Sequence, residues 1–203
     1  SHMIDSAYDL APADPGQRTL LILGVGPDKE KEAGYKATYE LLRDWARAHP
    51  EYQVLVKAHP RSKVPFWQQA ANELPQLTVL SHDCTLAEAL ERSSLVVNIM
   101  SNAVIEAALA RRPLLYVNVS GEQDIFAQER FFGSCVNTVN SLQARVIRIE
   151  SAYPAALQQS QAFAEYHLAN GCAGLVSNLE ALAALLDSQP LPGEIQRLVA
   201  TVE

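Results

Sequence analysis

The chain has 203 residues, of which 48% are hydrophobic and 19% charged, and its formal net charge is −7. This composition is typical of a globular chain with a substantial core, and the length allows one large domain or two small ones. The acidic balance argues against a nucleic-acid partner, whose surface would require a clustered basic face. No apolar run approaches the ~18 residues that a membrane span needs, so no transmembrane segment is expected. The three cysteines are widely separated, which favours buried thiols in a reducing compartment over disulfides or a zinc site.

The two ends of the chain are predicted to lie outside the main domain. Residues 1–3 resemble the remnant of a cleaved expression tag, so the natural protein is expected to be longer. Residues 1–18 contain prolines and a glycine and lack periodicity, which indicates a lead-in or linker. We expect residues 19–188 to form one domain, and residues 189–203 to form a tail that can become a short helix.

Short apolar runs alternate with segments of helical periodicity along most of the chain. This alternation is typical of a mostly parallel sheet with helices on both faces, a three-layer α/β fold of the Rossmann-like kind. The strands are expected at 19–23, 53–56, 77–80, 95–99 and 114–117, with a weaker one at 135–139. The helices are expected at 35–46, 66–74, 85–92, 103–111, from 141 onward, 155–169 and 175–186.

The second predicted strand ends in a group of potential phosphate donors. Lys57, His59 and Arg61 follow its apolar residues, and Pro60 ends the strand because it lacks a backbone donor. In parallel α/β sheets, ligands bind outside the carboxyl ends of the strands. These three side chains suit a phosphate or a sugar acid, although ordinary solvated charges fit this segment equally well.

Two glycines follow the first predicted strand. Gly24 and Gly26 allow a ligand to approach the backbone closely. The third glycine of the dinucleotide-binding fingerprint is missing, because Lys29 occupies its position. The charged residues 28–32 are expected to form a mobile loop.

The start of the helix expected at 103–111 is the second informative stretch. Ser101 or Asn102 is expected to cap this helix, whose free first-turn amides and dipole favour an anion. Glu106 lies one turn further on, where a carboxylate can accept hydrogen bonds from ribose hydroxyls. Taken singly, Ser101 fits an ordinary N-cap and Glu106 an exposed helix residue. Together with the His59 strand end they favour a nucleotide.

These two stretches resemble the carboxy-terminal half of GT-B glycosyltransferases. The resemblance rests on the Lys-x-His-Pro-Arg strand end and on the later Ser-Asn-x-x-x-Glu-Ala-Ala-Leu-Ala pattern, and it covers residues 19–186. It is closest to the bacterial surface-polysaccharide enzymes: capsule Kdo transferases, bacterial sialyltransferases and polyol-phosphate transferases. UDP-N-acetylglucosamine 2-epimerases share the architecture.

The resemblance implies a role for each matching residue. His59 would be catalytic, contacting the donor phosphate or its leaving oxygen. Ser101 and Asn102 would hold phosphate, and Glu106 would take the ribose. Lys57 and Arg61 flank the motif, and either of them can be the one that points inward; Gly24 and Gly26 complete the expected nucleotide-binding set by allowing close backbone approach. Neither a metal nor a cofactor is implied.

The implied function is donor binding in the synthesis of capsule or lipopolysaccharide-type polysaccharides. The donor would be a CMP-linked acidic sugar of the Kdo or sialic acid kind, or else a UDP-sugar. A glycan or lipid-linked acceptor would bind through an amino-terminal domain or partner chain. The location would be the cytoplasm, or the inner membrane face as part of a larger protein.

The chain departs from the family pattern in three ways, which leaves alternatives open. The most important is that a GT-B enzyme has two such halves, of which only one fits into 203 residues; in addition, Gln123 and Asp124 match a loop "QE" or "E" pair of some relatives poorly. Asn102 stands where many relatives have Ser, Thr or Gly, and no motif nominates a general base, since Asp83 is a candidate by position alone. The isolated chain is therefore expected to be inactive without its amino-terminal half. The alternatives are a non-catalytic α/β module for assembly or regulation, and a fragment of an epimerase-like enzyme.

Overall fold

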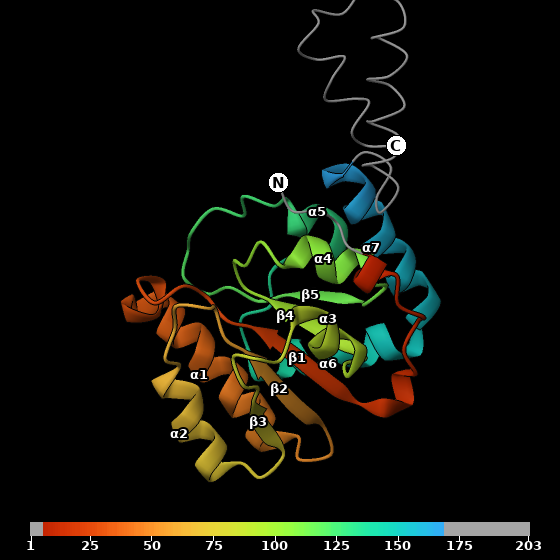
Figure 1. Cartoon of the computed structure of the whole chain (residues 1–203). Coiled ribbons are helices and arrows are strands. Elements are labelled where there is room, and N and C mark those ends of the chain that lie inside the picture. The colour runs from red at the N-terminus through yellow and green to blue at the C-terminus, as the bar shows by residue number, and fades with distance from the viewer. Residues whose placement is uncertain (1–5, 169–203) are drawn as a thin grey trace, which may run out of the picture.

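A five-stranded, entirely parallel sheet forms the centre of the molecule (Figure 1). The structure is a computed structural model and describes residues 6–168. The strands are arranged in the order β3-β2-β1-β4-β5. Their bounds are Thr19–Leu23 for β1, Gln53–Lys57 for β2, Leu77–Val79 for β3, Leu95–Asn98 for β4 and Leu114–Tyr116 for β5. The predicted α/β fold with a parallel sheet is confirmed.

Helices connect the strands and cover both faces of the sheet (Figure 1). Between residues 6 and 168 no helix is long and apolar enough to cross a membrane. The α-helices are α1 (Ala33–Ala48), α2 (Pro65–Glu73), α3 (Leu86–Glu91), α4 (Val104–Leu109), α5 (Gln128–Phe132), α6 (Val139–Ser151) and α7 (Tyr153–His167). The described part of the chain also contains three short 3₁₀ helices, η1 (Ser6–Tyr8), η2 (Pro15–Gln17) and η3 (Lys29–Lys31).

The alternation of side chains along β1 divides the interior into two cores. Leu20 and Ile22 join the residues of α1, α2 and α6 on one face. Leu21 and Leu23 join those of α3, α4, α5 and α7 on the other. Successive strand residues point to opposite faces, so a strand covered on both sides is apolar throughout. Burial of each such side chain stabilises the fold by about 1.5–3 kcal/mol.

The strand order places a crevice next to β1. From β1 the chain moves outward to β2 and β3, and then returns to pair β4 on the other side of β1. The connections after β1 and β4 therefore leave the sheet in opposite directions. Ligands of open α/β sheets bind at such a reversal, outside the carboxyl ends of the strands. In Figure 1 the arrowhead of β1 marks this edge.

The region after β5 differs from the sequence prediction. The weak strand expected at 135–139 is wrong, because Cys135 contacts Asn118 through its sulfur and not through a backbone ladder. Helix α6 begins at Val139, with Thr138 as the N-cap that accepts a hydrogen bond from the Ser141 amide. The helix expected at 175–186 and the tail at 189–203 lie outside the described residues.

The segment before β1 is attached to the domain by a buried arginine. Arg112 is 2% exposed, and its guanidinium donates hydrogen bonds to the carbonyls of Leu90 and Ala11, each at 2.8 Å. Burial lowers the pKa of the Arg112 guanidinium. Its neighbour Arg111 forms an ion pair with Asp9 at 3.0 Å. The residues of the lead-in that precede η2 therefore pack against the carboxyl end of α4.

Candidate functional site

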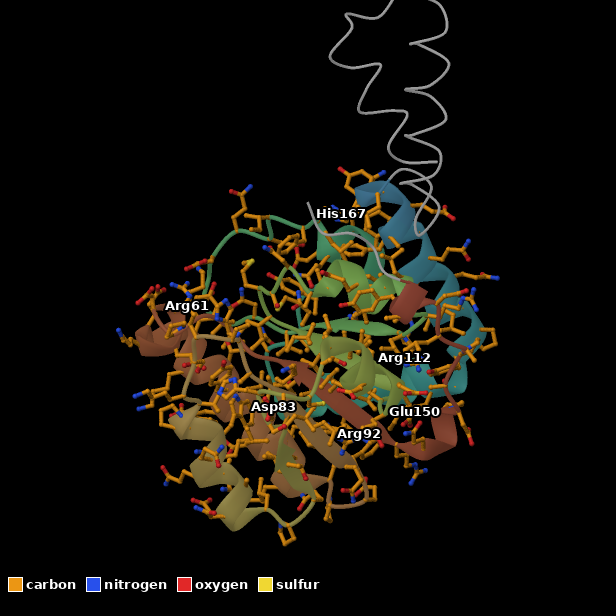
Figure 2. All side chains as sticks on the ribbon, in the orientation of Figure 1. Arg61, Asp83, Arg92, Arg112, Glu150 and His167 are labelled. Atoms are coloured by element: carbon orange, nitrogen blue, oxygen red, sulfur yellow. The ribbon has the colours of Figure 1, made fainter. Side chains whose placement is uncertain are left out.

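A cavity of about 350 Å³ opens at the carboxyl ends of β1, β2 and β4. Six of the eight sequence-predicted site residues line it: Gly24, Gly26, His59, Arg61, Ser101 and Asn102. A second cavity of about 170 Å³ shares three of these residues and is also lined by Lys57. Figure 2 shows Arg61 at the side of the loops that follow the strands, away from Arg112 and Glu150.

His59 lies between the two cavities with one ring nitrogen already engaged. Its Nδ1 accepts a hydrogen bond from the Arg61 backbone N–H at 3.2 Å, and its carbonyl accepts one from the Ser62 amide at 2.8 Å. A neutral imidazole with Nδ1 as acceptor carries its proton on Nε2. The tautomer is thus assigned from this hydrogen bond. Nε2–H is the group left for a ligand, and it is a donor.

The two glycines after β1 have different surroundings. A Cβ on Gly24 would lie 3.2 Å from the Lys57 carbonyl oxygen and 3.4 Å from the His59 nitrogen. The Gly24 amide also donates to the Lys57 carbonyl at 2.9 Å. Gly24 therefore lets β1 approach the backbone of β2, whereas a Cβ on Gly26 would meet nothing within 4 Å. Of these two glycines, only Gly26 leaves room for a Cβ.

A carboxylate network joins the loops that follow β1 and β2. Glu30 accepts hydrogen bonds from the Tyr39 hydroxyl at 3.2 Å and from the Ser62 hydroxyl at 2.5 Å. Tyr39 in turn accepts from the Val25 amide at 3.1 Å, and Ser62 from the Val64 amide at 2.9 Å. Burial is the main cause that raises the pKa of the Tyr39 phenol. The network holds the residues around Gly26 and the turn after His59 in one arrangement.

A second contact holds the loop after β1 against the loop after β5. The Lys29 ammonium, which lines the larger cavity, forms an ion pair with Glu122 at 2.6 Å and donates to the Tyr35 hydroxyl at 3.0 Å. The hydrogen bond from Lys29 lowers the pKa of the Glu122 carboxyl, and the hydrogen bond to Glu122 raises the pKa of Lys29. Within the loop expected at residues 28–32, Lys29–Lys31 form a 3₁₀ turn, and the Lys29 side chain contacts both Glu122 and Tyr35.

A buried amide at the end of β4 shapes the turn that carries Ser101. Asn98 is fully buried; its Nδ2 donates to the Gln128 side chain at 2.8 Å, and its Oδ1 accepts from the Ser101 amide at 3.1 Å. Both ends of this amide are paired, as a buried polar group requires. The turn from 99 to 103 is therefore anchored to α5, and Ser101 lines the cavity.

The start of α4 differs from the prediction. The helix begins at Val104 with Ala103 as its N-cap, and neither Ser101 nor Asn102 caps it with a side chain. Instead the Ser101 hydroxyl accepts from the Ala103 amide at 3.3 Å, in the turn that precedes the helix. Since α4 extends only from Val104 to Leu109, it aligns fewer peptide dipoles than the helix expected at 103–111. An anion here would depend on side-chain donors more than on the dipole.

Two other candidates lie apart from the cavities. Glu106 is half-buried in the first turn of α4 and lines neither cavity. Asp83 is exposed after β3 and borders a separate surface hollow with Cys84 and Glu88. Among the described residues that line the two cavities, the only carboxylate belongs to Asp28.

Comparison with solved structures shows where this fold occurs. The chain superposes on TarM with a TM-score of 0.57 at 12% sequence identity, covering 86% of this chain and 36% of that one. It superposes on a putative UDP-N-acetylglucosamine 2-epimerase from Listeria monocytogenes with a TM-score of 0.61 at 12% identity, covering 92% and 52%. The chain has the fold of a GT-B domain.

A third comparison includes a bound nucleotide. The S. aureus MnaA–UDP co-structure matches with a TM-score of 0.53 at 11% identity, covering 94% of this chain and 51% of that one. The chain thus spans between about a third and a half of the length of these three proteins. No protein-family model and no curated protein matches the sequence.

Proposed function

We propose that the chain is the donor-binding half of a GT-B glycosyltransferase and holds the phosphate of a nucleotide-sugar in the larger cavity. The observation that carries this proposal is the convergence of His59, Arg61 and Ser101 on one cavity at the strand-order reversal. Two segments far apart in sequence supply an imidazole N–H, a guanidinium and a hydroxyl. This set of donors matches the oxygens of a phosphate.

These donors also suit the chemistry of glycosyl transfer. When the bond from the sugar to the nucleotide breaks, the leaving phosphate oxygen gains negative charge. A donor placed in advance at that oxygen stabilises the transition state more than the ground state. His59 Nε2–H is assigned this role, with Arg61 and Lys57 neutralising the phosphate. Glu106 is assigned the ribose, outside the cavities described.

The nucleotide base of the donor is either cytosine or uracil in this proposal. The His-Pro strand end resembles enzymes that use CMP-linked acidic sugars such as Kdo or sialic acid. UDP is present in the MnaA co-structure and in a complex of a TarM mutant with Fondaparinux, α-GlcNAc-glycerol and UDP. The latter has a TM-score of 0.53 to this chain at 11% identity, covering 85% of this chain and 36% of that one. Binding of CMP against UDP decides between the two options.

Acceptor binding is assigned to a part of the enzyme other than this chain. The described cavity residues include one carboxylate, Asp28, and the chain spans 36% of TarM. We assign acceptor binding and proton removal to an amino-terminal half or a partner chain, which would receive a glycan or lipid-linked acceptor of capsule or lipopolysaccharide synthesis. This work would take place in the cytoplasm or at the inner membrane face, without metal or cofactor. The isolated chain would then bind donor without turnover.

An epimerase-like enzyme is the second candidate. It is favoured by the L. monocytogenes match, which covers 92% of this chain with a TM-score of 0.61. Both candidates require nucleotide-sugar binding at the same cavity. An activity assay of the full-length protein distinguishes the two candidates. An epimerase converts UDP-N-acetylglucosamine without an acceptor, whereas a transferase requires an acceptor.

Thermal denaturation with CMP, CDP, UDP and their sugars tests the proposal. A ligand at about 100 times its Kd stabilises by about 2.7 kcal/mol. We expect one nucleotide class to do so, and His59→Ala to remove the effect. His59→Gln, whose amide approximates Nε2, should retain more of it than His59→Asn. His82→Ala, at an exposed position, is the control. If no nucleotide stabilises the folded protein, a non-catalytic module for assembly or regulation becomes the better account.

A further inference from the structure

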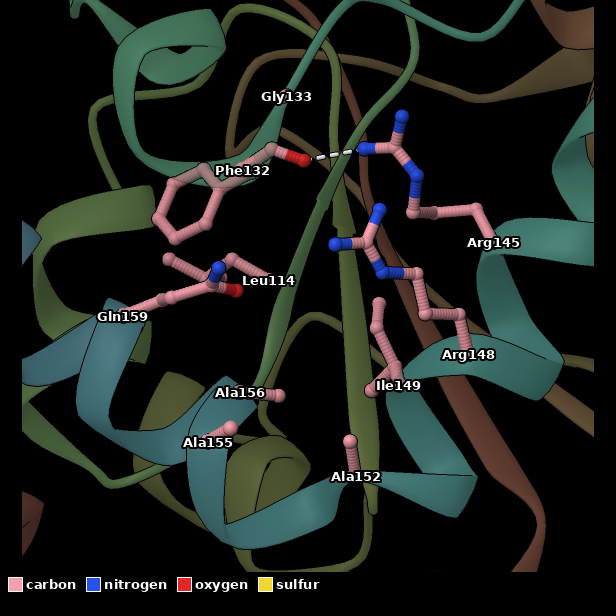
Figure 3. Close-up of a pocket in the computed structure, with 10 residues that line it drawn as sticks. All are labelled: Leu114, Phe132, Gly133, Arg145, Arg148, Ile149, Ala152, Ala155, Ala156 and Gln159. Carbon is pink, nitrogen blue, oxygen red and sulfur yellow. Dashed lines mark hydrogen bonds between the residues drawn. The ribbon is translucent and has the colours of Figure 1, made fainter.

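A separate cavity of about 180 Å³ lies between α5, α6 and α7, beside Leu114 at the start of β5 (Figure 3). It shares no lining residue with the two cavities at the strand ends. Its apolar wall comes from Leu114, Phe132, Ile149 and three alanines of the α6–α7 corner. A volume of 180 Å³ exceeds that of several water molecules, each of which occupies about 30 Å³ in the liquid.

Two guanidinium groups occupy one side of this cavity. Figure 3 shows the side chains of Arg145 and Arg148 extending from α6 into it, with Gln159 reaching in from α7. Arg145 is held in place because its Nη atoms donate to the carbonyls of Phe132 and Ser134. Among residues 6–168 the exposed Arg148 guanidinium makes no such contact, so it remains available as a donor. The first arginine is therefore fixed and the second is free to close on a ligand.

Neither guanidinium has a carboxylate partner among residues 6–168. Burial and the neighbouring charge of Arg148 lower the pKa of Arg145. Like charges one helical turn apart destabilise a helix. The helix dipole favours a cation in the last turn of α6, where Arg148 lies. The dipole does not explain why Arg145 lies at the same cavity. The arrangement is an excess of positive charge beside an apolar wall.

We propose that this cavity binds a small oxyanion, a phosphate or carboxylate group, between Arg145 and Arg148. Guanidinium groups donate two parallel hydrogen bonds to such groups, and the Gln159 amide supplies a further donor. An apolar remainder of the ligand would lie against Leu114 and Phe132. This site is independent of the nucleotide cavity and places a second ligand on the chain.

Titration with sodium phosphate and with sodium propionate, against sodium chloride at equal ionic strength, tests the proposal. The readouts are the melting temperature and the NMR signals of the arginine Nε–H groups. We expect saturable stabilisation by one of the two anions, which separates a phosphate from a carboxylate ligand. The Nε–H signals of Arg145 and Arg148 should shift with the same Kd.

Three kinds of variant locate the binding. Arg148→Gln should weaken it at least tenfold, and because Arg148 is exposed this variant should fold. Ala155→Glu places a carboxylate at the cavity, so it should raise the melting temperature without added anion and abolish the response. Arg92→Gln, an exposed arginine outside this cavity, should leave the response unchanged. Absence of saturable binding to the wild type, or equal binding to Arg148→Gln, would overturn the proposal.

Discussion

The Ser62 hydroxyl donates a hydrogen bond of 2.5 Å to the Glu30 carboxylate, joining residues 32 positions apart. Glu30 follows β1 and Ser62 follows β2, so this bond crosses the edge at which the larger cavity opens. The same carboxylate accepts from Tyr39, which is 2% exposed, as is Ser62. The positions of Gly26 and His59 therefore depend on a carboxylate that lines neither cavity.

Removal of this carboxylate should destabilise the protein. Glu30→Ala leaves the buried Tyr39 and Ser62 hydroxyls without their acceptor, which typically costs about 1–3 kcal/mol per unsatisfied group. Glu30→Gln keeps one acceptor oxygen and should cost less. Urea denaturation measures both. Glu91→Gln, at an exposed position, is the control and should stay within about 0.5 kcal/mol of the wild type. Equal stability of Glu30→Ala and the control would show that the network contributes nothing.

The two glycines after β1 should respond differently to alanine. In Gly24→Ala the new Cβ meets backbone atoms of β2 and the turn after it at 3.2–3.4 Å, and a backbone cannot rotate away as a side chain can. We expect a loss of about 1–3 kcal/mol, the usual range for overpacking. Gly26→Ala has open space and should leave stability unchanged while reducing nucleotide affinity. Denaturation and ligand titration of the matched pair check this, and equal stability would contradict it.

Asn98 should matter for stability and for the Ser101 turn. Asn98→Ala removes the partner of both the Gln128 side chain and the Ser101 amide, and should cost about 1–3 kcal/mol. Asn98→Asp keeps the acceptor for Ser101, so we expect it to retain more nucleotide affinity. Binding and unfolding measured together on the two variants distinguish these effects. Full nucleotide affinity in Asn98→Ala would show that the turn does not require this anchor.

The Lys29–Glu122 contact should contribute at neutral pH and disappear in acid. Glu122 has a lowered pKa in the folded state, so its contribution is present above the ordinary glutamate pKa of about 4.3 and is lost as pH falls through the lower folded value. The raised pKa of Lys29 keeps the ammonium charged well into the alkaline range. The stability difference between wild type and Glu122→Gln should therefore shrink below about pH 4. A pH-independent difference would exclude the ion pair as its source.

Much of the architecture could be predicted because it depends on local patterns. The apolar run at Thr19–Leu23 forms a strand buried on both faces, and α3 begins directly after Thr85, which forms a local capping box with Glu88. The same patterns predict strand ends at residues 56 and 99, each one residue from the observed ends at Lys57 and Asn98. The meeting of His59 and Ser101 follows because β2 and β4 both pair with β1 in a parallel sheet.

The remainder depends on contacts between residues far apart in sequence. In the sequence Glu30 is one of several charged residues in its segment. Only the structure shows that the Ser62 and Tyr39 hydroxyls both donate hydrogen bonds to it. Nothing in the residues around Cys135 shows that its sulfur contacts Asn118 and leaves no strand ladder. Asn98 did carry a usable signal, since a polar residue ending a buried apolar run must find a partner.

The central claim is that a nucleotide phosphate binds where His59, Arg61 and Ser101 converge. Backbone NMR of the chain during titration with UDP, and then with CMP, tests it most directly. The account predicts saturable shifts confined to three segments, Gly24 to Lys29, Lys57 to Arg61, and Met100 to Glu106, with the cavity beside Leu114 unaffected. Saturable shifts elsewhere while the signals of these segments stay unchanged would contradict it, as would the absence of binding of either nucleotide to the folded chain.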